Sequence, residues 1–212
     1  MCIRDRDTTD HLVREAPGIL RCKVDDILLA ALARVITEWT QRKEIVIEKE
    51  GHGRIDLFDD VDLSCTVGWF TTLYPLAIEL PTSEAWRDIV KSVKRQTNRT
   101  PEGISYGALR YLRDEQDPAL IPQTPIPIAF NYLGRFGGQD QGDGIVTRML
   151  PSPGFDHDRS ERRSNLLDIT GALTDGALIF NWTYSASRHH QRTIQRLADD
   201  YVAALTELAD YT

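Results

Sequence analysis

Apolar residues recur at helical spacing in several segments of the chain. The clearest case begins at Val24, where apolar side chains follow at intervals of three and four residues and either Asp25 or Asp26 can cap the helix start. A second amphipathic segment has Ser83 as its expected N-cap. The segments expected to be helical are 24–41, 83–99, a short stretch around 106–115, and 192–211.

Runs of β-branched and aromatic residues lie between these helical segments. Residues 44–48 form one such run, and residues 73–80 form another in which Pro75 favours an edge or a bend. Residues 126–133 are apolar and typical of a strand, and 165–185 predict a hairpin that turns at Asp175 and Gly176. Because strands and helices interleave, we expect an α/β fold in which helices pack on a mixed sheet.

Composition narrows the class of protein. The chain has 212 residues, 41% of them hydrophobic, which is enough for one domain or two small ones, and its net charge of −7 argues against a nucleic-acid partner. No apolar run approaches the roughly 20 residues that a membrane helix needs. Three cysteines without C-x-x-C spacing argue against a disulfide framework or a zinc site, so we expect a reducing, cytoplasmic setting.

The first six residues do not follow the logic of the rest. The sequence "MCIRDR" resembles a translated adapter leader, so we interpret residues 1–6 as non-native and leave them out of the fold prediction. On this interpretation the native protein continues upstream, and residues 7–212 are one part of it.

The stretch "EGHGR" directly after the 44–48 strand has two interpretations. Gly51 and Gly53 flank His52, and glycine is costly to order, so the pattern indicates either a turn at a strand end or a carboxylate held for chemistry. In the second case Glu50 is a candidate general base, which must be positioned before its pKa matters, and Arg54 is expected to hold its charge.

Other motifs have a structural and a functional interpretation as well. "CTVGWFTTLYP" at 65–75 is typical of a core strand with a turn, and "NYLGRF" at 131–136 places Asn131 and Tyr132 at a strand end, where a tyrosine hydroxyl could donate to an oxyanion. The Gly-rich stretch 134–144 lacks the lysine of a phosphate-binding loop. His189 and His190 are interpreted as a solvated helix start, and no metal-ligand spacing is found.

The motifs taken in order carry a more specific resemblance. "DDILLAAL", "EGHGR", "TVGWFTTLYP", "PEGISYGALRYL", "FNYLGRF" and "LLDITGAL" together resemble the C-terminal half of an epimerization domain of nonribosomal peptide synthetases. That group belongs to the condensation-domain superfamily, which implies a chloramphenicol acetyltransferase-like fold. The HHxxxDG motif of the family lies in an N-terminal half that is absent here. "HHQRTIQ" at 189–195 has Ile and Gln in place of Asp-Gly, so the catalytic histidine is not transferred to it.

The resemblance implies inversion at Cα of an aminoacyl or peptidyl thioester. It assigns Glu50 and Tyr132 as catalytic, with Asn131, His52 and Arg54 in support. It implies that Gly51, Gly53, Gly68 and Trp69 form a turn and substrate channel, with the glycines leaving room for a pantetheine arm. No cofactor or metal is expected on the chain itself, because the substrate is carried on the phosphopantetheine of a partner carrier domain.

Three hypotheses follow for the function. The first is an epimerization subdomain whose partners are a peptidyl carrier protein domain and the missing N-terminal half, so that this chain alone is inactive. The second is a condensation-type, amide-forming or degenerate relative. The third is a non-catalytic docking or scaffold fragment in which Glu50 is dispensable. Nucleic acid and membrane are not expected partners.

Overall fold

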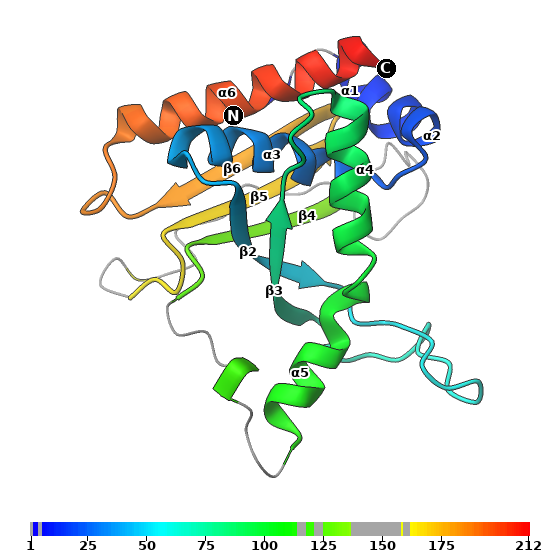
Figure 1. Ribbon diagram of the computed structural model, residues 1–212. Helices are drawn as coiled ribbons and strands as arrows, with labels where there is room; N and C mark the ends of the chain where they lie inside the picture. Colours follow the sequence, from blue (N-terminus) through cyan, green and yellow to red (C-terminus); the bar gives the residue numbers. More distant parts are fainter. Residues whose placement is uncertain (1, 4–5, 114–117, 121–124, 137–157, 159–161) are drawn as a thin grey trace.

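The strands form one mixed sheet in the described part of the chain. The computed structural model describes residues 2–3, 6–113, 118–120, 125–136, 158 and 162–212 (Figure 1). The strand order is β1-β6-β5-β4-β2-β3, in which β2, β4 and β5 are parallel and the other pairings are antiparallel. The strands are β1 (Cys2–Ile3), β2 (Glu44–Gly51), β3 (Thr72–Glu79), β4 (Ile128–Phe136), β5 (Leu167–Thr174) and β6 (Ala177–Tyr184).

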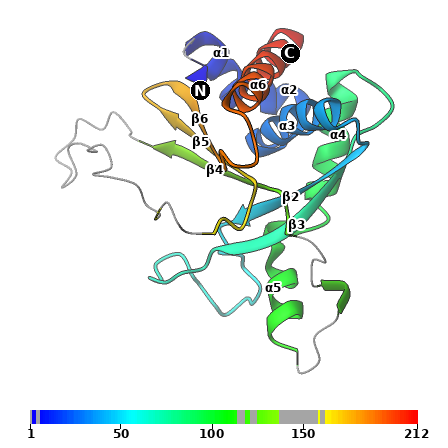
Figure 2. The same ribbon diagram turned by 90° about the vertical axis from the view of Figure 1, so that its left-hand side faces the viewer.

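The helices gather on one face of this sheet. Figure 2 shows α3 and α6 lying side by side above the strands, with α1 and α2 next to them, while α5 lies below β3, apart from the other helices. The elements are α1 (Arg6–Asp10), a π-helical turn (His11–Glu15), α2 (Ala16–Leu20), α3 (Val24–Thr40), α4 (Trp86–Thr97), a 3₁₀ turn (Pro101–Gly103), α5 (Ile104–Tyr111), a 3₁₀ turn (Pro118–Leu120) and α6 (Gln191–Tyr211).

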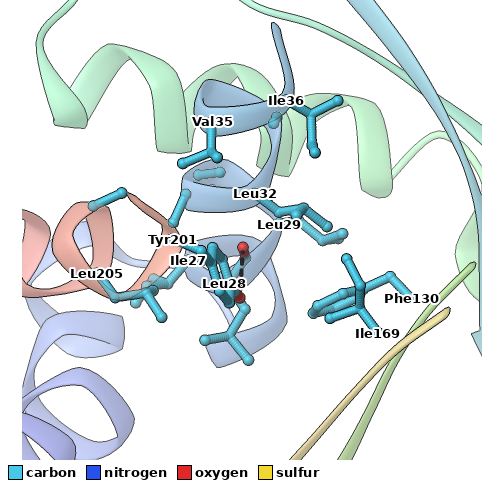
Figure 3. Packing of buried hydrophobic residues seen from close by; sticks show 14 of the residues in the cluster. Ile27, Leu28, Leu29, Leu32, Val35, Ile36, Phe130, Ile169, Tyr201 and Leu205 are labelled. Atoms are coloured by element: carbon cyan, nitrogen blue, oxygen red, sulfur yellow. Dashed lines mark hydrogen bonds between the residues drawn. The ribbon is translucent and has the colours of Figure 1, made fainter. Parts of the chain in front are cut away.

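The core lies between α3, α6 and the covered face of the sheet. Burial alternates along β5, where every second residue beginning with Leu167 is buried, as expected when one face of a strand packs on helices. In Figure 3, Leu29 and Leu32 of α3 point toward Phe130 of β4. The hydroxyl of Tyr201 on α6 donates to the carbonyl of Leu28 at 3.2 Å, which satisfies a fully buried phenol.

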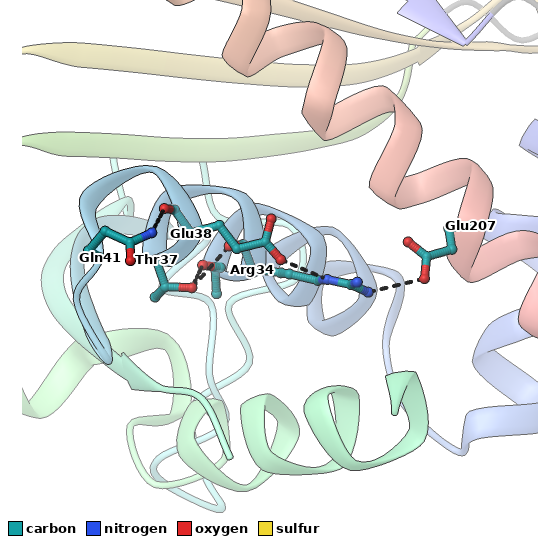
Figure 4. Close-up of polar contacts among 6 residues, drawn as sticks. Arg34, Thr37, Glu38, Gln41 and Glu207 are labelled. Carbon is teal, nitrogen blue, oxygen red and sulfur yellow. Dashed lines mark hydrogen bonds and ion pairs between the residues drawn. The ribbon is translucent and has the colours of Figure 1, made fainter. Parts of the chain in front are cut away.

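Polar contacts tie the outer side of α3 to α6 and end the helix (Figure 4). The Arg34 guanidinium lies 3.2 Å from a Glu38 carboxylate oxygen and 3.3 Å from a carboxylate oxygen of Glu207 on α6. Gln41 ends α3 with a left-handed backbone, and its side-chain amide donates to the Glu38 carbonyl at 2.6 Å. These contacts fix the helix end from which β2 begins.

The fold class expected from the sequence is confirmed: the structure is a mixed sheet with packed helices. The helix expected at 24–41 and the last helix are both present, and Asp26 accepts a hydrogen bond from the backbone N–H of Lys23 at 2.9 Å. The hairpin turns at Asp175 and Gly176, both with positive φ, as the tight turn requires.

Several expected boundaries were wrong. The second long helix begins at Trp86 after an Ala85 N-cap, and Ser83 hydrogen-bonds Asp88 instead of capping. The strand expected at 44–48 continues to Gly51, since its pairing with β3 runs on to Thr72.

Two expectations concern the parts of the chain that the structure describes least. Residues 137–144 of the Gly-rich stretch lie outside the described residues. Of the expected non-native leader, Cys2–Ile3 pair with β6 and Arg6 begins α1, so that the described residues there do have regular structure. The interpretation of residues 1–6 as non-native stays a prediction.

Candidate functional site

Glu50 lies on the face of the sheet opposite the helices. In β2 the buried residues are Ile45, Ile47, Lys49 and Gly51, which pack toward the helices. Side chains alternate between the two faces of a strand, so Glu48 and Glu50 project from the other face. Glu50 therefore stands near the C-terminal end of a strand, half-buried, on the side that α3 and α6 leave uncovered.

Asn131 on the neighbouring strand holds the Glu50 carboxylate. The Asn131 side-chain Nδ2 donates a short hydrogen bond to Glu50 Oε2. The pairing of β2 with β4 aligns Lys49 with Phe130, which places Glu50 beside Asn131 in the next register position. One carboxylate oxygen is thereby fixed by a donor, and Oε1 has no hydrogen-bond or ion-pair partner in the described part of the chain, so the arrangement can present a directed proton acceptor.

A polar row continues from this pair across the sheet. Asn131 is in register with Thr170 of β5, and Thr170 is in register with Asn181 of β6. On the other side of Glu50, the β3 residue in register is the exposed Leu73. The uncovered face thus offers a carboxylate, two amides and a hydroxyl in one line, groups that can bind a carbonyl or amide.

A second row lies one step back along the strands. Glu48 is in register with Ala129, which is in register with Asp168. The Asn165 side-chain amide donates to Glu48 Oε1 at 3.2 Å and to the Ile126 carbonyl at 3.0 Å. Glu48 is therefore held by Asn165. It lies on the same strand and face as Glu50, so it provides a comparison carboxylate next to the site.

The turn after Gly51 is built by His52 and Arg54. The Arg54 N–H donates to His52 Nδ1 at 3.1 Å. The Arg54 guanidinium donates to the carbonyls of Leu63 and Thr66 and lies 4.3 Å from the centre of the Phe70 ring. The expectation that Arg54 holds the charge of Glu50 was wrong, because no ion pair joins the two among the described residues. The guanidinium binds carbonyls of the 54–70 loop instead.

Gly53 has the positive φ that suits the expected turn, while the close packing around both glycines differs from the expectation. A Cβ at Gly51 would lie 2.7 Å from the Thr72 hydroxyl and 2.8 Å from the Glu102 carbonyl oxygen. Gly53 has φ +67°, and a Cβ there would lie 1.7 Å from the Phe70 carbonyl oxygen. The space beside each glycine is filled by the chain itself, so the expectation that they leave room for a pantetheine arm was wrong.

Tyr132 points away from Glu50. It follows Asn131 in β4, so the two side chains project from opposite faces of the sheet, and Tyr132 packs against the core. Burial raises the pKa of its phenol, and the Asp25 carboxylate raises it further, while Arg135 lowers it. The catalytic place that the resemblance implies for Tyr132 does not agree with this geometry, since Asn131 makes the contact with Glu50.

An ion pair between the largely buried Lys49 and the partly exposed Asp25 lies next to Glu50. Lys49 Nζ is 3.0 Å from Asp25 Oδ2 and donates to the backbone carbonyl of Glu50 at 3.0 Å. The Asp25 charge also contributes, after burial, to the raised pKa of Tyr201. The sequence predicted Asp25 only as a helix cap. The missed signal was Lys49, a charged residue at a buried position of an apolar strand.

Most of the motif at 65–75, residues 65–71, lies on the surface before β3 begins. The strand begins only at Thr72, so the expected core strand holds for 72–75, where Tyr74 is buried, and was wrong for 65–71. Val67 is 99% exposed and Trp69 is 92% exposed, and Leu57 and Phe58 in the same loop are also more than half exposed. Gly68 adjoins the Phe70 ring. An apolar loop therefore connects β2, which carries Glu50, to the edge strand β3.

The remaining candidates lie elsewhere. His190 is the N-cap of α6 and lines a surface hollow with Gln191, Arg192 and Gln195, which includes neither Glu50 nor Asn131. His189 is partly buried with its ring against Trp39, so its expected solvation was wrong. Within the described residues no three His, Cys, Asp or Glu side chains come together to hold a metal ion.

No helix in the described ranges is both long enough and apolar enough to span a bilayer.

Residues 5–212 match the family described as Condensation domain. The chain belongs to the condensation-domain family. It is 40% identical over 203 residues to one of the linear gramicidin synthase proteins of Brevibacillus parabrevis, covering 94% of this chain and 4% of that protein. It is 31% identical over 206 residues to tyrocidine synthase 1 of the same organism, covering 92% of this chain and 19% of that protein.

Solved structures of related domains share this fold. The crystal structure of the epimerization domain from the third module of tyrocidine synthetase B superposes with a TM-score of 0.88 at 30% identity, covering all of this chain and 47% of that one. The first condensation domain of the CDA synthetase superposes with a TM-score of 0.62 at 15% identity, covering 99% and 44%, which shows the fold alone. The chain thus spans about half of the solved domains and a small share of the curated relatives.

Proposed function

We propose that this chain is the C-terminal portion of an epimerization domain of a nonribosomal peptide synthetase, which interconverts L- and D-configured residues on a carrier-bound thioester. The observation that carries the proposal is the Glu50 carboxylate, held by the Asn131 amide at a strand end on the uncovered face of the sheet. The likeness to the tyrocidine synthetase epimerization domain supports this choice within the family.

The chemistry requires a base that reaches Cα and donors for an enolate. A thioester withdraws electrons, so the α-proton can be removed, and the resulting enolate oxygen needs hydrogen-bond donors. Glu50 Oε1 takes or returns the proton while Asn131 holds Oε2. The Thr170 hydroxyl and the Asn181 amide lie in the same polar row and can face the substrate's carbonyl groups.

Inversion also needs a group on the second face of the planar carbon. We assign that group to the N-terminal half of the same domain, which the family resemblance places upstream. This chain covers 47% of the solved epimerization domain, which is consistent with a further half of similar length. The 212-residue chain alone is therefore expected to show no α-proton exchange. Condensation-family domains bind no cofactor of their own, and the substrate arrives on a partner carrier domain.

Amide formation is the second candidate, because the matching family is described by condensation and not by epimerization. In that reaction an amine attacks a thioester and no α-proton exchanges with solvent. The two functions therefore differ in the incorporation of deuterium at Cα and in the formation of an amide product.

The test uses the full-length protein that contains this chain, with an aminoacyl thioester on its carrier domain in deuterated buffer. Glu50→Gln keeps the volume of the side chain and its contact with Asn131, and it is expected to lower α-deuterium incorporation by about 100-fold or more, the scale of lost general acid/base catalysis. Glu48→Gln is the matched control on the same strand and face, and it should retain exchange.

Two results would overturn the proposal. If the Glu50→Gln protein keeps nearly full α-deuterium exchange, Glu50 is not the base that moves the α-proton. Amide product without α-exchange in the unsubstituted protein selects the condensation reaction in place of epimerization.

A further inference from the structure

The 3₁₀ turn Pro101–Gly103 lies against the end of the strand that carries Glu50. The His52 backbone N–H donates to Glu102 Oε2 at 3.2 Å, and His52 Nε2 lies 3.7 Å from Glu102 Oε1. The Thr72 hydroxyl on β3 donates a short hydrogen bond to the Glu102 carbonyl. One residue therefore binds the turn after β2 through its carboxylate and the start of β3 through its backbone.

The contact is close on the side of Gly51. A Cβ on Gly51 would stand 2.8 Å from the Glu102 carbonyl oxygen and 2.8 Å from Glu102 Oε2. Only a glycine lets Glu102 approach the strand directly after Glu50 in this way. The packing leaves the 50–53 segment little freedom to shift while Glu102 is in place.

The backbone at Glu102 is in a conformation that glutamate disfavours. Its φ is +51° and its ψ is +11°, in the left-handed region, where a non-glycine residue is uncommon. The following Gly103 also has positive φ, and a Cβ there would lie 1.9 Å from the Tyr74 ring. The backbone at 102 would favour glycine, whereas the carboxylate contact with the turn needs glutamate, and strain of this kind is concentrated at functional sites.

We propose that Glu102 is a positioning residue that fixes the 50–53 turn and thereby the direction of the Glu50 carboxylate. The proposal rests on the proposed function of Glu50. Glu102 makes no contact with Glu50 itself; it acts by holding the backbone N–H of His52, two residues further along the chain. With its side chain 26% exposed, it is sheltered enough for that contact to persist.

A positioning role and a purely structural role predict different relations between stability and activity. Glycine at 102 removes the backbone strain together with the carboxylate, whereas alanine removes the carboxylate and keeps the strain. If Glu102 were merely structural, activity would follow the melting temperature. If Glu102 positions the turn, both variants lose activity to a similar extent, although the glycine variant melts at the higher temperature.

The experiment compares Glu102→Gly, Glu102→Ala and Glu102→Gln in the full-length protein. The first two are expected to lower the rate of α-deuterium exchange of the tethered thioester by about 10- to 100-fold, the scale of a misplaced catalytic group. Glu102→Gln retains an acceptor oxygen for the His52 N–H and is expected to stay within about threefold of the unsubstituted rate. The positioning role is overturned if Glu102→Gly keeps the unsubstituted rate, or if the rates follow the melting temperatures.

The matched control is Gln41→Gly. Gln41 also has a left-handed backbone, with φ +56°, and also loses a side-chain hydrogen bond on substitution, but it precedes the opposite end of β2. The control is expected to leave exchange unchanged. A loss equal to that of Glu102→Gly would show that any such relief of the backbone disturbs β2, and would overturn the specific role of Glu102.

Hydrogen exchange separates this proposal from the proposed function. Mass spectrometry of the same proteins follows the backbone amides of the peptide that covers residues 50–54. Faster exchange there in the glycine and alanine variants, but not in the glutamine variant, supports the positioning of the turn even if the unsubstituted protein shows no α-exchange and epimerization is thereby rejected. Equal amide exchange in all variants overturns the positioning.

Discussion

Lys49 Nζ lies 3.0 Å from Asp25 Oδ2 and joins the N-terminal turn of α3 to the strand that carries Glu50. The two side chains are unequally buried, with Lys49 10% exposed and Asp25 30% exposed. Asp25 Oδ1 is enclosed without a hydrogen-bond partner in the described structure. The pair therefore depends on the single contact between Lys49 Nζ and Asp25 Oδ2. Removing either partner leaves an uncompensated charge, which lowers the free energy of unfolding.

Removing either partner should destabilise the chain, by unequal amounts. Asp25→Asn leaves the more buried ammonium without its counter-charge, so we expect a loss of about 3 kcal/mol, the lower end for a broken buried pair. Lys49→Met leaves the more exposed carboxylate and should cost less. The free energy of unfolding, measured in urea for both single variants and the double variant, should show a double loss smaller than the sum.

The exposed pair of Arg14 and Asp10 provides the control for this cycle. Its atoms are 3.3 Å apart, but the side chains are 61% and 51% exposed. Exposed pairs contribute about 1 kcal/mol or less, so the same cycle there should show little coupling. Equal coupling energies in the two cycles would contradict the view that burial makes the Lys49 pair important.

Gly53 should not tolerate a side chain. Its φ of +67° is strained for alanine, and the added Cβ would meet the Phe70 carbonyl oxygen at 1.7 Å. Gly53→Ala is expected to lower the free energy of unfolding by at least about 1–3 kcal/mol, the cost of such a backbone conformation in a residue other than glycine. Chemical denaturation of the two proteins side by side measures it.

Gly107 is the comparison for that substitution. It lies within α5, and nothing stands within 4 Å of the position that a Cβ would take. Gly107→Ala should therefore stabilise the chain by about 0.5–1 kcal/mol through helix propensity. Opposite signs at the two glycines are the expected outcome; a loss at both would mean that the space around Gly107 is misjudged.

Tyr132→Phe should leave α-deuterium exchange almost unchanged, although the family resemblance points to Tyr132. Its ring packs against the core on the side of the sheet that faces the helices, whereas Glu50 and Asn131 are on the other side. Asn131→Ala removes the donor to Glu50 and is expected to lower α-deuterium exchange by about tenfold, within the range of a misplaced catalytic group. A larger loss for Tyr132→Phe than for Asn131→Ala would reverse this assignment.

The contrast between Asn131 and Tyr132 shows how far the sequence could lead. A strand was expected across 126–133, and alternation along it already places two consecutive residues on opposite faces. The sequence does not tell whether Asn131 or Tyr132 lies on the same side as Glu50. The register of β2 with β4 decides this, and Asn131 is 81 residues further along the chain than Glu50. The contact of Glu102 with His52, 50 residues apart, was hidden for the same reason.

The helices were easier to predict than the loops. The apolar spacing of 24–41 describes a helix that is buried on most sides, and the structure has it at Val24–Thr40. In 65–71 the same preference for apolar residues misled, because apolar and small residues alternate there as in a core strand, yet Val67 and Trp69 are almost fully exposed. Sequence pattern records which residues are apolar, but not which surface covers them.

The exposed loop leads to a prediction about association. Val67 and Trp69 are 99% and 92% exposed, close in sequence and joined by Gly68 to form an apolar surface on the loop before β3. Exposed apolar patches of this kind mark interaction surfaces, and the proposal of an N-terminal half upstream predicts that this half covers it. The 212-residue chain alone is therefore expected to self-associate, and Val67→Ser combined with Trp69→Ser should shift it toward monomer in light scattering after size exclusion. Leu112→Ser is the control, since Leu112 is 82% exposed at the end of α5, away from the loop, and should change the association little. A chain that is monomeric at high concentration before any substitution would show that the loop is not a docking surface.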